Sequence, residues 1–440
     1  MPAEQRFRTI TVFEQRNQPR GAWNYTGDEG ISKDNTPIPN AAPRQNPQSS
    51  VSAPIISPVY DSLETNIPNL MMQFCDFSFP PGTALFPTRR VVQEYLCRYA
   101  KDVLDIYLLE KTKAGVDVSN AQFDAVVVIN GHYNKPNMPS IPSLEEWNQK
   151  IPGVIVHSSA YRRAAPFTNK KVIILSHPAS GIDIAAQIGQ VSKHPLLISE
   201  RTTPTPTPPR QEPEPEPPIV HVPEITHLNP QNARVRFSNG HEVQIIDHII
   251  FCTGYLFSLP FLSSLPLPIV TDGLRLHQLY NHVFYSPEPN LAFIGTTQFI
   301  VPFPFSQAQS AWVARVFAGR IPPPSSTERT RWLRVLEESH TDENGRRANT
   351  LAFPLAEYIN SLYGISMGAS RREGLENEGR GKEAPFWGER ERLVCKRFPV
   401  IKKASRLLGE RRKDITSLEG LRFYFGSSEE GELGLRKALL

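Results

Sequence analysis

Short hydrophobic runs recur along the chain and are separated by longer polar stretches. Most of these runs are dominated by Val, Ile and Leu and end near a Gly, Thr or Ser, and they lie at residues 123–131, 172–176, 196–200, 243–255 and 291–296. Unbroken apolar runs of this length are typical of strands buried on both faces of a parallel sheet. Residues 10–15, ITVFEQ, are a further strand candidate.

A different periodicity indicates helices. Residues 89–105 place five apolar side chains on one helical face, namely Val92, Tyr95, Leu96, Tyr99 and Val103. A helix entry also follows the strand at 172–176. Alternation of strands and helices predicts an α/β fold with a parallel sheet, in which ligands bind at the carboxyl ends of the strands.

Proline marks the loops. The chain has 42 prolines among 440 residues, nearly twice the usual share of about 5%. Residues 31–59 are polar and proline-rich, and residues 203–218 read TPTPTPPRQEPEPEPP. We interpret both segments as solvated connectors, the second as an extended surface insertion. The chain length is that of about two or three domains.

Composition argues against several classes of protein. A net charge of +4 gives no signature of nucleic-acid binding. The four cysteines, Cys75, Cys97, Cys252 and Cys395, form no CxxC pair, so a disulfide scaffold, a zinc ribbon or a dithiol redox centre lacks support. No run of about 18 apolar residues indicates a membrane span, and the charged first fifteen residues are unlike a secretion signal.

The first strand candidate ends in Glu14. In a dinucleotide fold an acidic residue at the tip of the second strand accepts the hydroxyls of an adenosine ribose, although a strand that ends in Glu is also common without that role. Gly21 permits close approach of the backbone to a ligand, and Trp23 can line an aromatic ring.

Six sequence blocks resemble the flavin-containing monooxygenase family, in the family's own order. They are VFEQRNQPRGAWNYTG after the first strand, YDSLETNIP, FDAVVVINGHYNKPNMPSIPSLEEW, IPGVIVHSSAYR, IIFCTGY and LAFIGTTQFIVPFPFSQAQSAW. The fourth is similar to the family's FxGxxxHxxx(Y/F) signature, with Ile151 where Phe is usual. The blocks span residues 10 to about 320, and the proline content suggests a fungal-type member.

The resemblance implies two nested Rossmann-like dinucleotide-binding domains with parallel sheets. We expect the first half of an FAD-binding domain at 1–150, an NADPH-binding domain at 151–245, the second half of the FAD-binding domain at 246–365 and a basic helical tail at 366–440. The family's initial strand and GxGxxG turn are not found in this sequence. We therefore expect a truncated first domain that lacks its initial βα unit and leaves sheet edges open.

The resemblance also implies which residues contact FAD. They are Glu14, Gln15, Gly21, Trp23, Thr65, Asn66, Gly131, Gly254 and Gln309. Asn66 is the candidate catalytic residue, because the family places its amide over the flavin ring, although an Asn before Ile-Pro is also a natural turn residue. Gly254 is equally open to interpretation as an ordinary strand-end glycine, and Trp312 is expected in the core.

For NADPH the resemblance implies Ser180, Gly181, Ser199 and Arg201. A cation at a strand end suits the 2′-phosphate of NADP, while a plain surface arginine is the alternative. The family's G-x-[GS]-x-S-G turn has changed, because Ser176 replaces the first Gly and Pro178 removes a backbone donor.

Two histidines invite a catalytic role that we do not assign. His157 and Tyr161 belong to the signature, and we interpret them as residues that order the backbone, although His titrates near neutrality. We interpret His132 as a hinge residue. The sequence shows no Ser-His-Asp set, paired carboxylates or HExxH motif, and we expect no metal site.

The chemistry implied by the resemblance belongs to the cofactors. NADPH reduces FAD, the flavin forms a hydroperoxide with O₂, and one oxygen atom passes to a small amine or thioether while the protein excludes water. The competing hypothesis is an impaired remnant with partial nucleotide binding or an interaction role, because GxGxxG is missing. A pyridine-nucleotide disulfide reductase is disfavoured, since no redox cysteine pair is present.

The tail is basic. Residues 371–413 carry 14 Lys+Arg against 7 Asp+Glu, and KRFPVIKKASRLLGERRK has the pattern of an amphipathic helix. We interpret this helix as solvated, with attachment to anionic lipid as the alternative. The expected location is the cytoplasm, with peripheral contact at the endoplasmic reticulum as an option.

Overall fold

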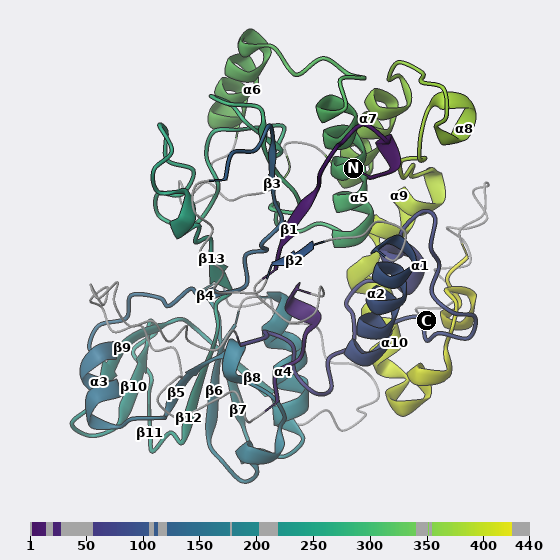
Figure 1. Ribbon diagram of the computed structural model, residues 1–440. Helices are drawn as coiled ribbons and strands as arrows, with labels where there is room; N and C mark the ends of the chain where they lie inside the picture. The colour runs from purple at the N-terminus through teal and green to yellow at the C-terminus, as the bar shows by residue number, and fades with distance from the viewer. Residues whose placement is uncertain are drawn as a thin grey trace. The chain divides into compact units, whose positions relative to one another are not determined.

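The computed structural model describes residues 2–14, 21–27, 56–104, 110–112, 121–176, 178–201, 219–339, 351 and 354–424. Gln15, residues 31–55 and the insertion at 203–218 lie outside the described residues. Two compact units are formed (Figure 1). Unit 1 comprises Met1–Gly21, Glu64–Gly131 and Phe257–Leu440, and unit 2 comprises Ala22–Leu63 and His132–Leu256.

The division between the units differs from the expected boundaries. The main segment of unit 2 begins at His132 and ends at Leu256, not at 151 and 245, and a further segment of unit 2, Ala22–Leu63, lies within the range 1–150 expected for the first FAD-binding half. The reason is a local pairing, because β4 (Lys135–Pro136) is antiparallel to β13 (Tyr255–Leu256). These hydrogen bonds tie residues after 131 to those just before 257.

Unit 2 is built on a parallel sheet with the strand order β5–β12–β6–β7–β8 (Figure 1). The strands are β5 (Ile155–His157), β12 (His248–Cys252), β6 (Val172–Ser176), β7 (Leu196–Ser199) and β8 (Ile219–Val222). Helix α4 (Pro178–Gly189) follows β6. The parallel strands predicted at 172–176 and 196–200 are therefore confirmed.

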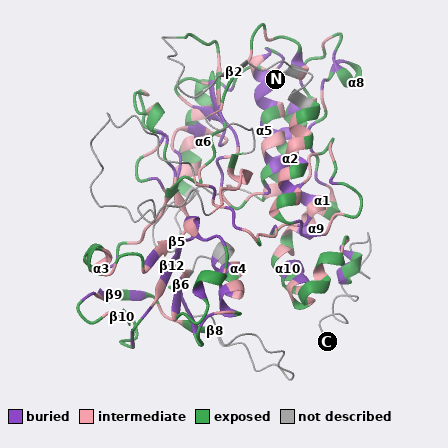
Figure 2. Ribbon diagram, turned by 60° about the horizontal axis from the view of Figure 1, so that its bottom comes forward, coloured by how far each residue is buried: buried purple, intermediate pink, exposed green. Residues whose placement is uncertain are grey.

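Both faces of this sheet are covered. Ile173 of β6 packs in one core cluster with Trp147 of α3 (Leu144–Lys150) and Leu228 of β9 (Ile225–Asn229). Its neighbour Ile174 packs in the other cluster with Ile184 of α4. Successive side chains of a strand point to opposite faces, so a sheet covered twice needs unbroken apolar sequence. Figure 2 shows these strands as largely buried.

The run at 243–255 is not one strand. It divides into β11 (Glu242–Gln244), which joins β10 (Arg234–Phe237) and β9 in an antiparallel sheet, and β12 in the parallel sheet. Between them Ile245 has φ 58° and is 78% exposed. A β-branched residue in the left-handed region requires a turn, and this turn transfers the chain from one sheet to the other.

Unit 1 contains two smaller sheets. The larger has the order β14–β15–β16–β3, in which β3 and β16 are parallel. In a separate sheet β1 and β2 are parallel partners. The strands are β14 (Leu279–Tyr280), β15 (Phe284–Tyr285), β16 (Leu291–Phe293), β3 (Val126–Val128), β1 (Thr11–Phe13) and β2 (Glu110–Thr112).

The prediction of a buried strand over 123–131 is wrong. Only three residues form β3, and Val126 and Ile129 are 43% and 68% exposed, whereas Val128 is buried. Within the described ranges β3 pairs with β16 alone and is the last strand of its sheet. An edge strand with neighbours on one side leaves apolar surface uncovered.

Unit 1 also contains most of the described helices. They are α1 (Asn69–Met72), α2 (Arg89–Leu104), α5 (Pro302–Phe317), α6 (Ser326–Ser339), α7 (Leu355–Met367), α8 (Glu376–Gly379), α9 (Glu389–Lys396) and α10 (Phe398–Leu407). The predicted helix at 89–105 is confirmed, with Val92 and Tyr95 buried. Trp312 of α5 lies in the core as expected, with its ring 4.8 Å from that of Phe284.

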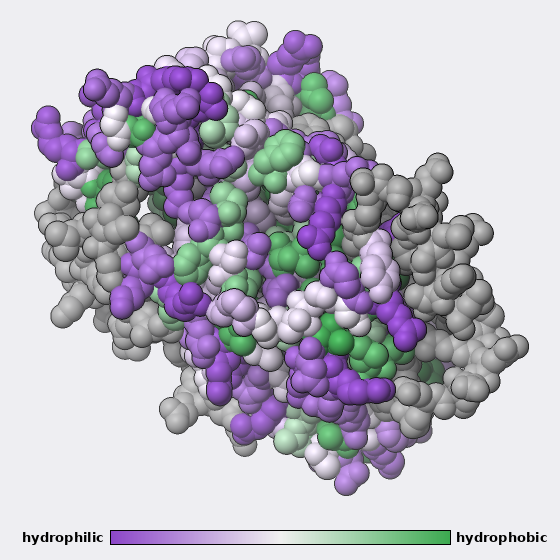
Figure 3. Space-filling model, turned by 90° about the vertical axis from the view of Figure 1, so that its right-hand side faces the viewer, coloured by the Kyte–Doolittle hydropathy of each residue, from purple (hydrophilic) through white to green (hydrophobic). Residues whose placement is uncertain are grey.

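The surface is mixed in character. On the face shown in Figure 3, hydrophobic residues lie in patches between hydrophilic ones. Among the helices that the structure describes, none combines the length and apolar character that crossing a bilayer demands.

Candidate functional site

The signature residue His157 ends β5 and is fully buried. The backbone N–H of Ser159 donates to its Nδ1 at 3.1 Å, so Nδ1 is an acceptor and Nε2 carries the proton. Nε2 donates to the carbonyl oxygen of Gly254 at 3.0 Å. Burial lowers the pKa of His157 to about 4, which keeps the ring neutral at pH 7. This geometry agrees with the interpretation of His157 as a structural residue.

Gly254 forms the turn at the carboxyl end of β12. Its φ is +77°, and a Cβ there would meet no atom within 4 Å. Conformation, not crowding, therefore favours glycine. Besides His157, the backbone N–H of Asn137 donates to the Gly254 carbonyl at 2.9 Å. The carbonyl has two structural donors, so a ligand here would have to meet other atoms of the turn.

Helix α4 starts directly after β6, at the carboxyl edge of the sheet. Ser180 and the buried Gly181 lie in its first turn, and the Ser180 side chain is outside the description. Further along, Asp183 accepts a hydrogen bond from the Tyr60 hydroxyl at 2.5 Å and one from Gln187 at 3.0 Å. This link between α4 and residue 60 could not be predicted from sequence, because its two residues are far apart along the chain.

Ser199 and Arg201, the two candidate residues at the end of β7, differ in whether a ligand could contact them. Ser199 is fully buried, and its hydroxyl donates to the Pro223 carbonyl at 3.0 Å. Arg201 is exposed at the carboxyl end of the same strand. Its guanidinium, and not the Ser199 hydroxyl, is placed to meet an anion at this edge.

In unit 1, Thr65 and Asn66 differ in burial and in hydrogen bonding. Thr65 is buried, its hydroxyl donates to the Ile67 carbonyl at 2.8 Å, and its N–H donates to the Pro87 carbonyl at 3.0 Å. Asn66 is exposed, and within the described part of the chain its amide makes no hydrogen bond. Thr65 fixes the backbone, and Asn66 keeps a donor and an acceptor for a ligand.

Gln309 of α5 has no exposed surface. Its Oε1 accepts from the Gly295 N–H at 2.8 Å, and its Nε2 donates to the Tyr358 hydroxyl at 2.9 Å. Gly295 has φ +69°, and a Cβ there would lie 3.0 Å from the Ser306 hydroxyl oxygen. Gln309 thus supports the glycine turn after β16 and reaches a ligand only through it.

The remaining candidates lie at strand ends and in turns. Glu14 follows β1 and is partly buried, and Gly131 follows β3 with φ +69°. Gly21 has φ +47° and Trp23 is partly exposed, both in a short 3₁₀ turn. Glycine suits both left-handed positions because they would strain other residues.

The residues of unit 2 fit a dinucleotide in outline. The N-terminus of α4 and Arg201 lie at the same carboxyl edge of a parallel sheet, where backbone N–H groups and a cation suit phosphates. In unit 1 the Thr297 hydroxyl just after β16 is buried without a hydrogen-bond partner among the described residues. A buried hydroxyl is costly when unpaired, so a polar ligand there is favourable.

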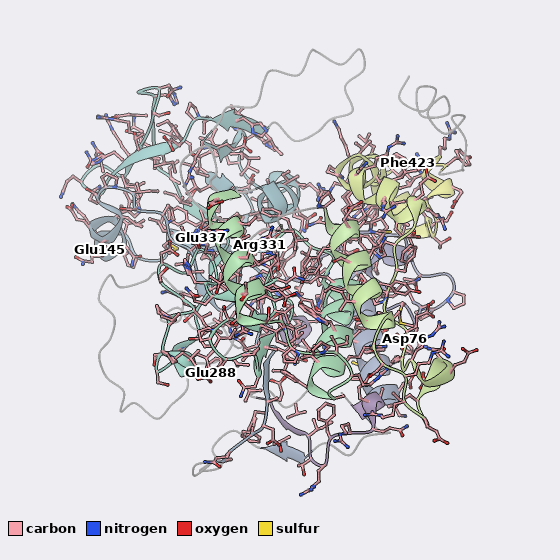
Figure 4. The ribbon with its side chains drawn as sticks, turned by 90° about the horizontal axis from the view of Figure 1, so that it is seen from above. Asp76, Glu145, Glu288, Arg331, Glu337 and Phe423 are labelled. Carbon is pink, nitrogen blue, oxygen red and sulfur yellow. The ribbon has the colours of Figure 1, made fainter. Side chains whose placement is uncertain are left out.

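Two of the four thiols, those of Cys252 and Cys75, are unsuited to redox chemistry. Burial raises the pKa of Cys252 to about 12. Cys75 lines a cavity of about 630 Å³ that includes none of the candidate residues, and burial raises its pKa to about 11. Asp76 beside it (labelled in Figure 4) pairs with Lys382 at 2.5 Å. A protonated thiol is a poor nucleophile, which agrees with the argument against a disulfide reductase.

The fold and the turns at its strand ends define an α/β protein of the dinucleotide-binding class. The sequence profile of the flavin-binding monooxygenase-like family matches residues 110–204 and 219–368. The flavin-containing monooxygenase FMO GS-OX1 of Arabidopsis thaliana is 31% identical over 343 residues, which cover 72% of this chain and 70% of that protein. The chain therefore belongs to the flavin-binding monooxygenase-like family.

Two further relatives extend the comparison. The thiol-specific monooxygenase of Saccharomyces cerevisiae is 33% identical over 294 residues, which cover 60% of this chain and 66% of that protein. The structure of S-allyl-L-cysteine S-oxygenase from Allium sativum superposes with a TM-score of 0.73 at 27% identity, covering 95% of this chain and 92% of that one. Family membership makes this protein a flavoprotein oxidoreductase of the monooxygenase type, which uses O₂ and a small substrate.

Proposed function

We propose that the chain catalyses FAD- and NADPH-dependent transfer of one oxygen atom from O₂ to a soft nitrogen or sulfur atom of a small compound. The observation that carries the proposal is Asn66, an exposed amide without a hydrogen bond in the described structure, beside a Thr65 whose polar groups are all engaged. Two relatives are named for sulfur substrates, so we expect sulfur compounds to be preferred.

When bound, FAD and NADPH would supply the electrons and the activation of O₂. The chain's residues would bind and orient them. Arg201 would meet the 2′-phosphate of NADPH, and the Asn66 amide would hydrogen-bond the flavin edge. Glu14 would accept ribose hydroxyls, and the Thr297 hydroxyl would gain the partner that the described residues do not provide. Glu14, Gly21, Gly131 and Gly254 remain proposed contacts of FAD.

The direct test is oxygen uptake by the purified chain supplied with FAD and NADPH. A thioether and a tertiary amine of similar size would be compared, with product identified by mass spectrometry. We expect NADPH consumption to match formation of a sulfoxide and, more slowly, an N-oxide. NADPH consumption that yields hydrogen peroxide alone, whichever compound is supplied, would contradict the proposal.

Asn66→Ser tests the residue itself. Loss of the amide should raise the share of NADPH electrons that leave as hydrogen peroxide several-fold, because a flavin contact is lost. The matched control is Asn290→Ser, an exposed asparagine of the same unit. Unchanged coupling in Asn66→Ser would remove this residue from the mechanism.

A catalytically impaired chain is the second candidate. One observation favours it: Val126 and Ile129, which precede the proposed FAD contact Gly131, are exposed. Titration of the purified chain with FAD separates the two. Saturable binding supports the enzyme, whereas absence of binding together with measurable NADPH affinity supports the impaired protein.

A further inference from the structure

The basic tail is not uniformly solvated. Two of its cations pair with groups of the protein: Lys402 of α10, which is buried, and Arg412 of the following 3₁₀ helix Gly409–Asp414, whose side chain is partly buried. Their partners lie in the Glu64–Gly131 segment of unit 1. In Figure 4 this tail is the segment that ends near the labelled Phe423, which is buried.

Lys402 is only 5% exposed. Its Nζ donates to the carbonyl oxygen of Thr65 at 2.8 Å and lies 3.6 Å from the Glu64 carboxylate. It also lies 4.4 Å from the ring centre of Phe86. A buried ammonium group is tolerated only when such partners replace its hydration, so these groups hold one another in place.

Arg412 holds the same carboxylate from another direction. Its Nε and Nη2 donate to the two oxygens of Glu64 at 3.0 and 2.9 Å, a bidentate geometry that fixes orientation. Nearby, the Leu85 N–H donates to the Ile415 carbonyl at 2.7 Å. The tail therefore contacts the 64–87 region through side chains and backbone alike.

The result is a fixed backbone immediately before Asn66. The Thr65 N–H, hydroxyl and carbonyl each have a partner, namely the carbonyls of Pro87 and Ile67 and the Lys402 ammonium group. Of the three partners, the Lys402 ammonium is the only one supplied by the tail. The next peptide unit carries the exposed Asn66 side chain.

We propose that Lys402 is a positioning residue: it anchors the Thr65 carbonyl and so sets the position of the Asn66 amide toward the flavin. The role of Asn66 in this statement rests on the proposed function. The anchoring of residues 64–67 by the tail does not, and it can be measured without cofactor.

The test compares Lys402→Met, Lys402→Arg and Lys403→Met in the full chain. Met keeps length and removes the charge, Arg restores a cation, and Lys403 is the exposed neighbour on the same helix. Amide hydrogen exchange of residues 64–67 is measured on the FAD-free protein. We expect Lys402→Met to exchange about tenfold faster or more, Lys402→Arg to recover part of the protection, and Lys403→Met to match wild type.

The second measurement is peroxide released per NADPH consumed. Lys402→Met should raise it toward the Asn66→Ser value, and the double variant should release no more than Asn66→Ser alone. Faster exchange confined to 64–67 supports the proposal, and unchanged exchange there overturns it. If Lys402→Met does not fold, Lys402→Gln replaces it. Its shorter, uncharged donor should give faster exchange at 64–67 by a smaller factor than Met, and unchanged exchange again overturns the proposal. If Asn66→Ser leaves coupling unchanged while exchange still rises, the catalytic role of Asn66 fails and the anchoring stands.

Discussion

Strands β6 and β3 are both short, rich in β-branched residues and parallel to their neighbours, yet they differ in burial. In β6, Val172, Ile173 and Ile174 have no exposed surface. In β3, Val126 is 43% exposed. β6 pairs on both sides, with β12 and β7, whereas β3 pairs only with β16 in the described structure. Position in the sheet, and not strand composition, decides burial.

This difference in burial bears on the two nucleotide sites that we propose. In unit 2 the carboxyl edge of a complete sheet is rigidly tied, for example by His157 and Gly254. In unit 1 the strand before Gly131 has an open apolar edge. We therefore expect unit 2 to tolerate change poorly and the β3 edge to tolerate it well.

The largest expected effect is a decrease in the free energy of unfolding at low pH, caused by the buried imidazole of His157 in unit 2. Burial lowers the pKa of His157 from 6.5 to about 4. Between these values the unfolded chain binds a proton that the folded chain does not, so the stability is fully present above pH 6.5 and falls as the pH decreases to about 4. The loss is about 3 kcal/mol at most.

Denaturant unfolding across this pH range would measure the effect, with His157→Gln as the comparison. The free energy of unfolding of wild type should fall more steeply than that of the variant. Parallel pH profiles would show that the ring is accessible and that this edge of unit 2 is less tightly closed than we describe.

Shortening a buried side chain in the five-stranded sheet of unit 2 should lower the free energy of unfolding by a slightly smaller amount. Val172→Ala removes two methyl groups from a fully buried position in β6, and we expect the free energy of unfolding to drop by about 2–3 kcal/mol. Thermal or denaturant unfolding measures it. A loss below about 0.5 kcal/mol would mean that the sheet relaxes around the cavity and would weaken the contrast between the units.

The next largest effect is expected at the proposed contact between Arg201 and NADPH. If Arg201 binds the 2′-phosphate as proposed, Arg201→Ala removes a charge-assisted hydrogen bond to it, so the KM for NADPH should rise about tenfold or more while that for NADH stays constant. Lys193→Ala, another exposed cation of unit 2, is the control. An unaltered NADPH-to-NADH ratio in Arg201→Ala would mean that the phosphate is held elsewhere.

The smallest effect is expected at the open edge. Val126→Ala makes the same substitution as Val172→Ala in β3, and stability should change by less than about 0.5 kcal/mol, because the side chain is already in contact with water. A loss comparable to that of Val172→Ala would show that β3 is covered in solution.

Local sequence predicted those features that depend on local pattern. The structure confirms the strands predicted at β6 and β7 and the helix predicted at α2, because the spacing of apolar residues along a short segment predicts its secondary structure. The burial of β3 was not predicted correctly, since it depends on neighbouring strands. The turn at Ile245 was also not predicted, because a β-branched residue is not typical of turns.

The candidate site shows the same limit. Turn glycines such as Gly254 and Gly295 stand out in sequence, and Asn66 was found through family resemblance. The partners of Gln309, namely Gly295 and Tyr358, and the contact between Lys402 and Thr65 join residues far apart in sequence. A lysine within a basic run gives no indication that its ammonium group is buried.

The central claim is that this chain binds FAD in a form that NADPH can reduce, and the visible absorbance of the purified protein tests it most directly. After incubation with FAD and removal of unbound cofactor, we predict a retained flavin band that bleaches when NADPH is added without oxygen. A colourless protein after the same treatment would contradict the account.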